Sequence, residues 1–271
     1  MEKILVATDL SVNSTSSIHF AFNLARLKGA TLIIAHVYHI IKPKSWRPHR
    51  FENYHAKRRE FLLEKMENLI DRALSNSDRS IEHMEVDLIM HSNTVNALIK
   101  CAARHKCTHV CISTHGNGKN KKNLGLTSTK LIAKMPIPIF SIPKAYKIKN
   151  IVSICYVSDL TNYQKEISKL VHYLNLFHAE LLILHIKQRN ETIIRSSLLQ
   201  TRILKRIGIS IKVKYANRTS TDSLIVDMNK AIKKLRPSLN RSTHYLNSIH
   251  YTAEAPSLSF LKKMPVLALK R

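Results

Sequence analysis

The sequence predicts an α/β protein built from two tandem open-sheet domains, each a mostly parallel five-stranded sheet flanked by helices. Three observations lead to this fold class. The chain has 271 residues, of which 44% are hydrophobic and 23% charged, so it has enough apolar material for one large or two small cores. Short β-rich runs alternate with longer helical patterns, as in βαβ units around a parallel sheet. Several short segments also recur in the same order in the two halves.

The first half contains a complete set of strands and helices. Its opening strand is a short apolar run after Lys3, and the segments with helical periodicity separate the later strands. The stretch Lys42 to Arg50, with two prolines and Trp46, is predicted to be a loop that leads into the second helix. The predicted elements are a strand at 3–9, a helix at 14–28, a strand at 31–38, a helix at 50–75, a strand at 84–90, a helix at 93–105, a strand at 108–114, a helix at 127–134 and a strand at 137–142.

Four segments recur collinearly, which predicts an internal repeat. The offsets between the copies are 150, 149, 129 and 129 residues, so one shortening of about twenty residues separates the second copy from the first. We therefore predict domains at 1–144 and 149–271, joined by a short linker rich in lysine. The paired segments are Thr8–Ser11 with Ser158–Thr161, Ala30–Val37 with Ala179–Ile186, Ser113–His115 with Ser242–His244, and Lys134–Pro136 with Lys263–Pro265.

The composition limits the compartment and the class of partner. Forty-four lysines and arginines against 18 acidic residues give a formal net charge of +26, which favours an anionic partner. The four cysteines form no CxxC pair, so the sequence indicates neither a disulfide framework nor a zinc ribbon. The first apolar run is too short for a signal peptide, and no window approaches the roughly 18 apolar residues of a membrane span. We therefore expect a soluble, cytoplasmic protein.

One edge of the first predicted sheet gathers residues suited to an anionic ligand. In an open parallel sheet, ligands bind beyond the carboxyl ends of the strands, where the strand order switches. Asp9 ends the first strand, Val37 lies near the end of the second, and Ser113 to Gly118 follow the fourth. Three of the five glycines lie between 116 and 125, ahead of a helix that begins near Thr127. A glycine-rich turn at a helix N-terminus offers N–H groups to phosphate, and the same loop carries Lys119, Lys121 and Lys122.

These segments together resemble the universal stress protein family over nearly the whole chain. The resemblance rests on the opening Ile4–Ser11, the strand end His36–Tyr38, the turn Thr114–Gly116 and the closing Pro138–Pro143. It implies two Rossmann-like domains that form an intramolecular pseudo-dimer through their last strands, Ile137–Ile142 and Val266–Leu269, and it leaves a homodimer open. It also implies a non-enzymatic role in the stress response.

The same resemblance assigns an ATP site to the first domain only. Nucleotide-binding members carry two glycines separated by two residues and, nine residues later, a glycine followed by Ser or Thr. At these positions this chain has Ser113, Gly116, Leu126 and Thr127, with Gly125 one place early. Asp9 is expected to meet the adenine or ribose, and the backbone around Val37 the adenine. The expected cofactor-binding residues are thus Asp9, Val37, Ser113, Gly116, Gly118, Thr127 and Ser128.

The second copy is predicted to have lost the phosphate loop. With the offset of 129 residues, Gly116 corresponds to Tyr245, Gly118 to Asn247 and Thr127 to Pro256. Side chains at the turn positions would block close approach of the backbone to a phosphate, and proline removes a donor. We therefore expect the second domain to be a packing partner.

Other interpretations of the same residues remain open at this stage. Asp9 could serve as a helix cap, and the glycine loop could be an ordinary turn. Cys101, His105 and His109 have a four-residue spacing, but the helix should end before His109, so we expect no metal site.

We find no catalytic motif and expect no enzyme. The alternative function is a basic adaptor that binds polyanions, such as nucleic acid or an anionic surface, through residues 42–59 and 119–134 without sequence specificity.

Overall fold

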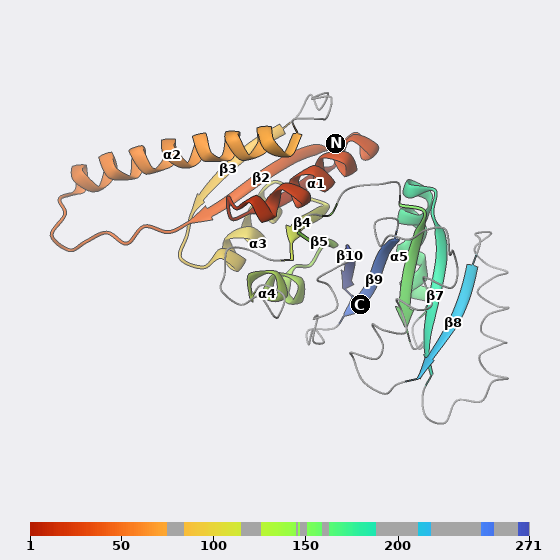
Figure 1. Cartoon of the computed structure of the whole chain (residues 1–271). Helices are drawn as coiled ribbons and strands as arrows, with labels where there is room; N and C mark the ends of the chain where they lie inside the picture. Colours follow the sequence, from red (N-terminus) through yellow and green to blue (C-terminus); the bar gives the residue numbers. More distant parts are fainter. Residues whose placement is uncertain are drawn as a thin grey trace. The chain divides into compact units, whose positions relative to one another are not determined.

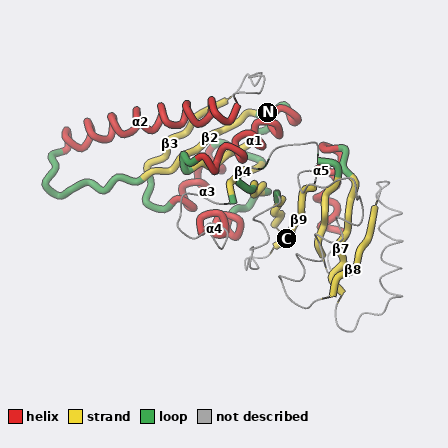
Figure 2. The backbone as a smooth tube through the Cα atoms, in the orientation of Figure 1, coloured by secondary structure: helices red, strands yellow, loops and turns green. Residues whose placement is uncertain are grey.

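The computed structural model describes residues 1–74, 84–114, 126–144, 146, 151–158, 163–187, 211–217, 245–251 and 265–270. The chain forms two compact units, unit 1 at Met1–Tyr146 and unit 2 at Lys147–Arg271. Strands and helices alternate along unit 1, as the ribbon and tube views show (Figures 1 and 2). In the described ranges, no helix combines the length and apolar character needed to cross a membrane.

Unit 1 has an open sheet of five parallel strands in the order β3-β2-β1-β4-β5. Every element predicted for the first half is present, with ends that differ by two residues at most, so the α/β prediction is confirmed for this unit. A short 3-10 helix, Val12–Ser14, precedes the first α-helix. The elements are β1 (Lys3–Thr8), α1 (Thr15–Lys28), β2 (Thr31–Tyr38), α2 (Pro48–Leu74), β3 (Met84–Met90), α3 (Thr94–Arg104), β4 (His109–Ser113), α4 (Leu126–Lys134) and β5 (Ile139–Ile142).

The four helices cover the two faces of this sheet in pairs. The chain moves outward from β1 to β2 to β3 and then returns past β1 to β4 and β5. Because parallel crossovers are right-handed, this reversal sends α1 and α2 to one face and α3 and α4 to the other. The contacts agree, since α1 packs on α2 and α3 packs on α4 (Figure 1).

The core of unit 1 lies between the central strands and these helices. Residues 4–8 of β1 and 31–36 of β2 are buried, which is typical of strands covered on both faces. From α1, Phe20 packs against Phe140 of β5 with ring centroids 5.1 Å apart. In contrast, the edge strand β3 exposes Met84, Val86 and Met90.

Unit 2 has its own parallel strands in the order β8-β7-β6-β9-β10, which repeats the order of unit 1. Among the described residues of this unit, the helix α5 lies between β6 and β7 and packs on β6. The described elements are β6 (Ser153–Ser158), α5 (Tyr163–Phe177), β7 (Glu180–Lys187), β8 (Ile211–Asn217), β9 (Tyr245–Tyr251) and β10 (Val266–Lys270).

The helix that follows the first strand ends in the same way in both units. After α1, Gly29 has a φ of 57° and Ala30 N–H donates to the Ala25 carbonyl at 2.9 Å. After α5, His178 has a φ of 49° and Ala179 N–H donates to the Leu174 carbonyl at 2.9 Å. Both are left-handed C-caps, and each residue of the second set lies 149 positions after its counterpart.

The register of β9 corrects one part of the predicted repeat. Tyr245 and Asn247 lie within β9, where they pair with Ser153 and Cys155 of β6. They are therefore not loop residues equivalent to Gly116 and Gly118, and the offset of 129 residues is wrong at this point. The sequence between β9 and β10, residues 252–264, nevertheless contains no glycine. Pro256 and the segment Ser242–His244 lie outside the described residues.

Candidate functional site

The strand order of unit 1 creates a switch point at the carboxyl ends of β1 and β4. From β1 the chain leaves toward β2, and from the adjacent β4 it leaves toward β5 on the opposite side. The two loops that follow these strands therefore separate beyond the sheet edge, which is where open α/β sheets bind ligands. A hydrogen bond of 3.1 Å from Ser113 Oγ to the Asn13 carbonyl links the two loops.

Asp9 organises the loop that follows β1. Its Oδ1 accepts hydrogen bonds from Ser11 N–H at 3.1 Å and from Ser14 Oγ at 3.0 Å. Leu10 has a φ of 60°, in the left-handed region, and donates its N–H to Thr8 Oγ1 at 3.0 Å. Asp9 itself is exposed. The carboxylate thus fixes the turn between β1 and the first helical residues while it stays accessible at the sheet edge. The N-cap residues are Ser11 and Ser14, and neither helix start has a side-chain cap, so the helix-cap interpretation of Asp9 is wrong.

The ends of the glycine-containing loop are held together at β4. Ser128, buried in the first turn of α4, donates its hydroxyl to the Ser113 carbonyl at 2.8 Å. Thr114 N–H donates to the Ile142 carbonyl at 2.9 Å. The end of β4 and the start of α4 therefore lie close together, and Thr127 is exposed at this position.

Gly116 and Gly118 lie outside the described residues.

The end of β2 forms a third side of this edge. Val37 is half-buried and pairs with Ile89 of β3. Its neighbour His36 is buried, and His36 Nδ1 donates to the Thr8 carbonyl at 2.9 Å. Burial lowers the pKa of His36, and the charge of Arg58 on α2 lowers it further, whereas the Thr8 bond and Asp9 act in the opposite direction. Asp9 and Arg58 therefore both lie within electrostatic reach of this imidazole.

A row of rings continues from His36 onto α2. His36 stacks with Tyr38 at 6.5 Å between centroids, and Tyr38 stacks with His55 at 6.0 Å. The Tyr38 hydroxyl and His55 Nε2 are hydrogen bonded at 2.7 Å. These contacts hold the first half of α2 against the end of β2. The sequence places His55, Arg58 and Arg59 in the predicted polyanion-binding segment 42–59 but not at this edge, because only the strand pairing and the helix contacts bring them here.

The structure thus brings five of the predicted site residues to one edge of the unit 1 sheet. Asp9 follows β1, Ser113 is the last residue of β4, and Val37 lies one residue before the end of β2. Thr127 and Ser128 lie in the first turn of α4. Ser113 and Ser128 donate their hydroxyl hydrogens within the protein, so in this arrangement these hydroxyls cannot also donate to a ligand. The exposed carboxylate, the helix N-terminus and the nearby arginines can bind a polar anionic molecule.

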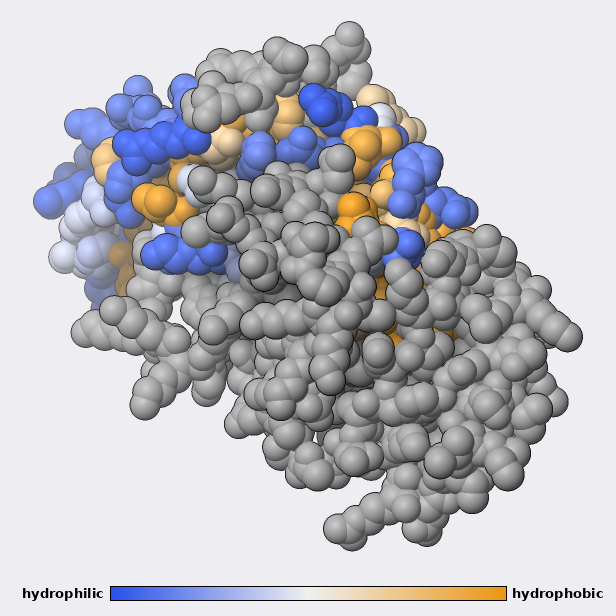
Figure 3. Space-filling model, turned by 45° about the vertical axis from the view of Figure 1, so that its right-hand side comes forward, coloured by the Kyte–Doolittle hydropathy of each residue, from blue (hydrophilic) through white to orange (hydrophobic). Residues whose placement is uncertain are grey.

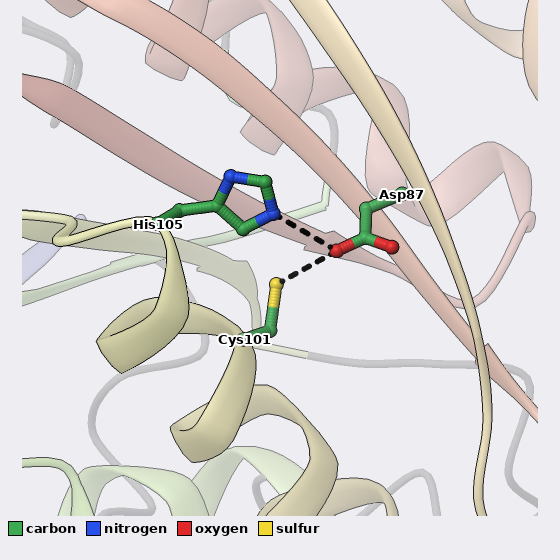
Figure 4. Close-up of side chains that lie close together, drawn as sticks. All are labelled: Asp87, Cys101 and His105. Atoms are coloured by element: carbon green, nitrogen blue, oxygen red, sulfur yellow. Dashed lines mark hydrogen bonds and ion pairs between the residues drawn. The ribbon is translucent and has the colours of Figure 1, made fainter.

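A second polar cluster lies between β3 and α3. Asp87 Oδ2 accepts from Cys101 Sγ at 3.3 Å and from His105 Nε2 at 3.1 Å (Figure 4). The Arg104 guanidinium also contacts Asp87. Although burial would raise the pKa of Asp87, the bonds from Cys101 and His105 and the charge of Arg104 outweigh it and lower the pKa. Burial, reinforced by Asp87, raises the pKa of Cys101 to about 12.

The four-residue spacing in the sequence groups a different set of three residues, Cys101, His105 and His109. His109 lies in β4, as predicted, where it contacts Thr108 at 2.9 Å and stacks on Phe140, apart from Cys101 and His105. Asp87 was missed, because its distance from Cys101 along the chain hides the contact that the packing of α3 on the sheet creates. The sequence does contain a signal for this cluster: Asp87 lies within a predicted strand, and the helix that follows carries Cys101 and His105.

Solved structures of similar fold cover the whole chain. A universal stress protein from Archaeoglobus fulgidus matches with a TM-score of 0.65 and 16% identity, covering 99% of this chain and 98% of that protein. A functionally unknown protein from Pseudomonas aeruginosa matches with a TM-score of 0.60 and 14% identity, covering 100% and 92%. At these identities the likeness concerns the fold alone. No curated protein sequence matches the chain.

A sequence profile adds the decisive comparison. The profile of the universal stress protein family matches residues 1–143, which is the span of the five strands and four helices of unit 1. The matched span exceeds half of the chain and includes Asp9, Val37, Ser113 and Ser128. The chain belongs to the universal stress protein family.

Proposed function

We propose that this protein is a non-enzymatic stress-response protein that binds one adenine nucleotide, ATP, at the carboxyl edge of unit 1. The observation that carries the proposal is the convergence of Asp9, Val37 and the start of α4 on the switch point between β1 and β4. Membership of the universal stress protein family supports an adenine nucleotide as the ligand. The loops that follow β1 and β4 support the location of the site at this edge of the sheet.

The proposed roles follow from the position of each group. Asp9 accepts hydrogen bonds from the ribose or adenine while its Oδ1 keeps the bonds from Ser11 and Ser14. The backbone at Val37 contacts the adenine. The phosphates lie toward Gly116, Gly118 and the first turn of α4, where Thr127 is exposed. The positive charges of Arg58 and Arg59 favour an anionic ligand at this edge in general, because Arg58 acts on His36 and Arg59 acts on Tyr38 at the end of β2.

We further propose that unit 2 is a second copy of the domain without a nucleotide site. Its strand order repeats that of unit 1, and its first helix ends in the same cap 149 residues later. The absence of glycine from residues 252–264 supports the loss of the phosphate loop. One chain should therefore bind one nucleotide.

Thermal unfolding with and without MgATP tests the nucleotide site. A ligand that binds only the folded state stabilises it by about 2.7 kcal/mol at a concentration of 100 times its dissociation constant. We expect ATP to raise the melting temperature of the wild-type protein and to leave that of Gly116→Val unchanged, because the added side chain blocks approach of the backbone to the phosphate. GTP and inorganic phosphate distinguish recognition of adenine from recognition of phosphate alone.

Gly29→Ala is the matched control for this experiment. It also replaces a glycine in unit 1, but at the helix cap after α1. This variant should have a lower melting temperature than the wild type, and ATP should raise that temperature by as much as it does in the wild type. Absence of any shift in the wild-type protein at millimolar ATP would reject the site, and an equal shift in Gly116→Val would reject the role of the glycine loop.

A second candidate function, polyanion binding, is favoured by cations that lie over aromatic rings along α2 and the preceding loop. Arg50 lies 5.0 Å from the centroid of Trp46, and Lys42 lies 5.8 Å from that of Phe51. Phe61, 42% exposed, is flanked by Arg58 and Lys65 at 5.3 and 4.6 Å. Figure 3 shows hydrophobic patches among predominantly hydrophilic residues on the described surface. Such surfaces can bind nucleic acid through phosphate contacts and stacking.

A titration with random duplex DNA at two salt concentrations tests this candidate. Binding through phosphates should weaken steeply with salt, and the double variant Trp46→Ala/Arg50→Ala should weaken it more than Arg26→Ala, which removes an exposed charge from α1. Lack of binding at low salt would remove the candidate without affecting the nucleotide proposal.

A further inference from the structure

Asp87, Cys101 and His105 bring three metal-binding atoms together in unit 1. The carboxylate oxygen, the thiol sulfur and the imidazole nitrogen all lie within 4.8 Å of one another. In Figure 4 the three side chains point toward a common centre, Asp87 from β3 and the other two from the end of α3. None of the three belongs to the proposed nucleotide site.

Local structure explains why these side chains converge. Cys101 and His105 are four residues apart, so they lie on one face of the last turn of α3, where His105 is the C-cap. This helix packs on the sheet next to the edge strand that carries Asp87. Cys101 is buried, whereas the side chains of Asp87 and His105 are 17% and 18% exposed, so the cluster is accessible from one side.

We propose that Asp87, Cys101 and His105 bind a zinc ion, with the fourth coordination position left to water or another ligand. Zinc prefers thiolate, imidazole and carboxylate ligands at about 2.0–2.3 Å, which places neighbouring ligand atoms about 3.3–3.6 Å apart in a tetrahedron. The distances of 3.3 Å from Cys101 Sγ and 3.1 Å from His105 Nε2 to Asp87 Oδ2 are close to this geometry. On binding, the Cys101 thiol and His105 Nε2 each release a proton to solvent, so the sulfur coordinates as thiolate and the imidazole as a neutral ligand.

The second nitrogen of His105 supplies an independent indication. His105 Nδ1 lies 3.5 Å from Glu85 Oε2, on the side of the ring opposite the cluster, and Lys3 pairs with Glu85 at 3.2 Å. A carboxylate that accepts the other N–H of a ligating histidine fixes its tautomer and orientation, and this is the usual arrangement at zinc sites. At 3.5 Å Glu85 makes no hydrogen bond to Nδ1 here, but it is placed to accept that N–H when Nε2 binds the metal.

Arg104 opposes the metal in this arrangement. Its guanidinium contacts the same Asp87 oxygen that faces Cys101 and His105, and its side chain is 61% exposed. Zinc must displace this cation from the carboxylate, and the exposed side chain can move into solvent. Removal of Arg104 should therefore strengthen zinc binding, whereas a purely structural ion pair would only lose stability.

Zinc titration of the full chain, freed of metal by a chelator and followed by competition with a chromophoric indicator, tests the proposal. We expect one zinc per chain, and a loss of affinity of at least about tenfold in Cys101→Ser, Asp87→Asn and His105→Asn. Glu85→Gln, at an exposed position, should lose about tenfold through the histidine that it orients. Arg104→Ala should gain affinity. Cobalt in place of zinc should give a sulfur-to-metal charge-transfer band that disappears in Cys101→Ser.

Two control variants make the result specific. His109→Asn removes the residue that the sequence spacing alone would include, and Cys155→Ser removes a buried thiol of unit 2. Both should bind zinc as the wild type does. Absence of zinc binding, or binding that the three ligand substitutions leave unchanged, would overturn the proposal, as would a loss of affinity in Arg104→Ala. Circular dichroism of each variant identifies any that fails to fold, and Glu85→Gln and Arg104→Ala then decide the question.

Discussion

Replacement of Lys106 by glycine should stabilise unit 1. Lys106 follows α3 with a φ of 55°, and Cys107 N–H donates to the Ala102 carbonyl at 2.8 Å, as in the caps at Gly29 and His178. Only one of these three left-handed caps is glycine. Lys106 is exposed, so its side chain contributes little packing that the substitution would remove.

The magnitude follows from two opposing terms. A residue with a side chain destabilises the folded state by roughly 1–2 kcal/mol in the left-handed region, and glycine removes this cost. Glycine also makes the unfolded chain more flexible, which lowers the free energy of unfolding by roughly 0.5–1 kcal/mol. Lys106→Gly should therefore raise the free energy of unfolding by about 0.5–1 kcal/mol. Gly29→Ala should lower it by a similar amount, because a Cβ at Gly29 meets no heavy atom within 4 Å and only the backbone conformation is penalised.

Urea denaturation followed by the fluorescence of Trp46, the single tryptophan, measures this change in unit 1. The control is Lys100→Gly within α3, also exposed, which should destabilise by about 1 kcal/mol because the helix interior disfavours glycine. If Lys106→Gly destabilised the unit as much as Lys100→Gly does, the cap geometry would be refuted.

Three further predictions concern the edge of the sheet. Asp9→Asn should keep most of the stability, since an amide oxygen can still accept from Ser11 and Ser14, whereas Asp9→Ala should lose about 1 kcal/mol by urea denaturation; equal losses would contradict the role of the Asp9 oxygen in holding this turn. Ser128→Ala should cost about 1–3 kcal/mol and weaken ATP binding measured by calorimetry, because the buried hydroxyl holds the Ser113 carbonyl; unchanged stability would contradict this. Burial lowers the pKa of His36 below 6.5, so the unfolded chain binds a proton at this residue more strongly than the folded chain does. The free energy of unfolding should therefore fall as the pH drops below about 6.5. His36→Gln should show a smaller fall in urea denaturation across this pH range, and a fall identical to that of the wild type would refute the contribution of His36.

The fold of unit 1 was predictable from local patterns. The predicted strand at 31–38 is β2 without any shift of its ends, and the predicted helix at 14–28 differs from α1 by one residue. Apolar runs flanked by helical periodicity identify buried parallel strands well, because both faces of such strands are covered. Asp9, Val37 and Ser113 were likewise placed correctly at the strand ends, since the sheet edge follows directly from the order of elements.

The parts that could not be predicted depend on packing between distant segments. Tyr245 was assigned to a loop because a three-residue match gave the wrong offset, and only the pairing of β9 with β6 corrects it. Asp87 reaches Cys101 through the packing of α3, and Arg58 reaches His36 through the packing of α2. A sequence pattern with a period of a few residues contains no information on such contacts.

Isothermal titration of the full chain with MgATP both detects nucleotide binding and counts the sites. We expect one ATP per chain for the wild type, one for Gly29→Ala and none for Gly116→Val. Two nucleotides per chain, or one nucleotide that still binds to Gly116→Val with unchanged affinity, would contradict a single site at the carboxyl edge of unit 1.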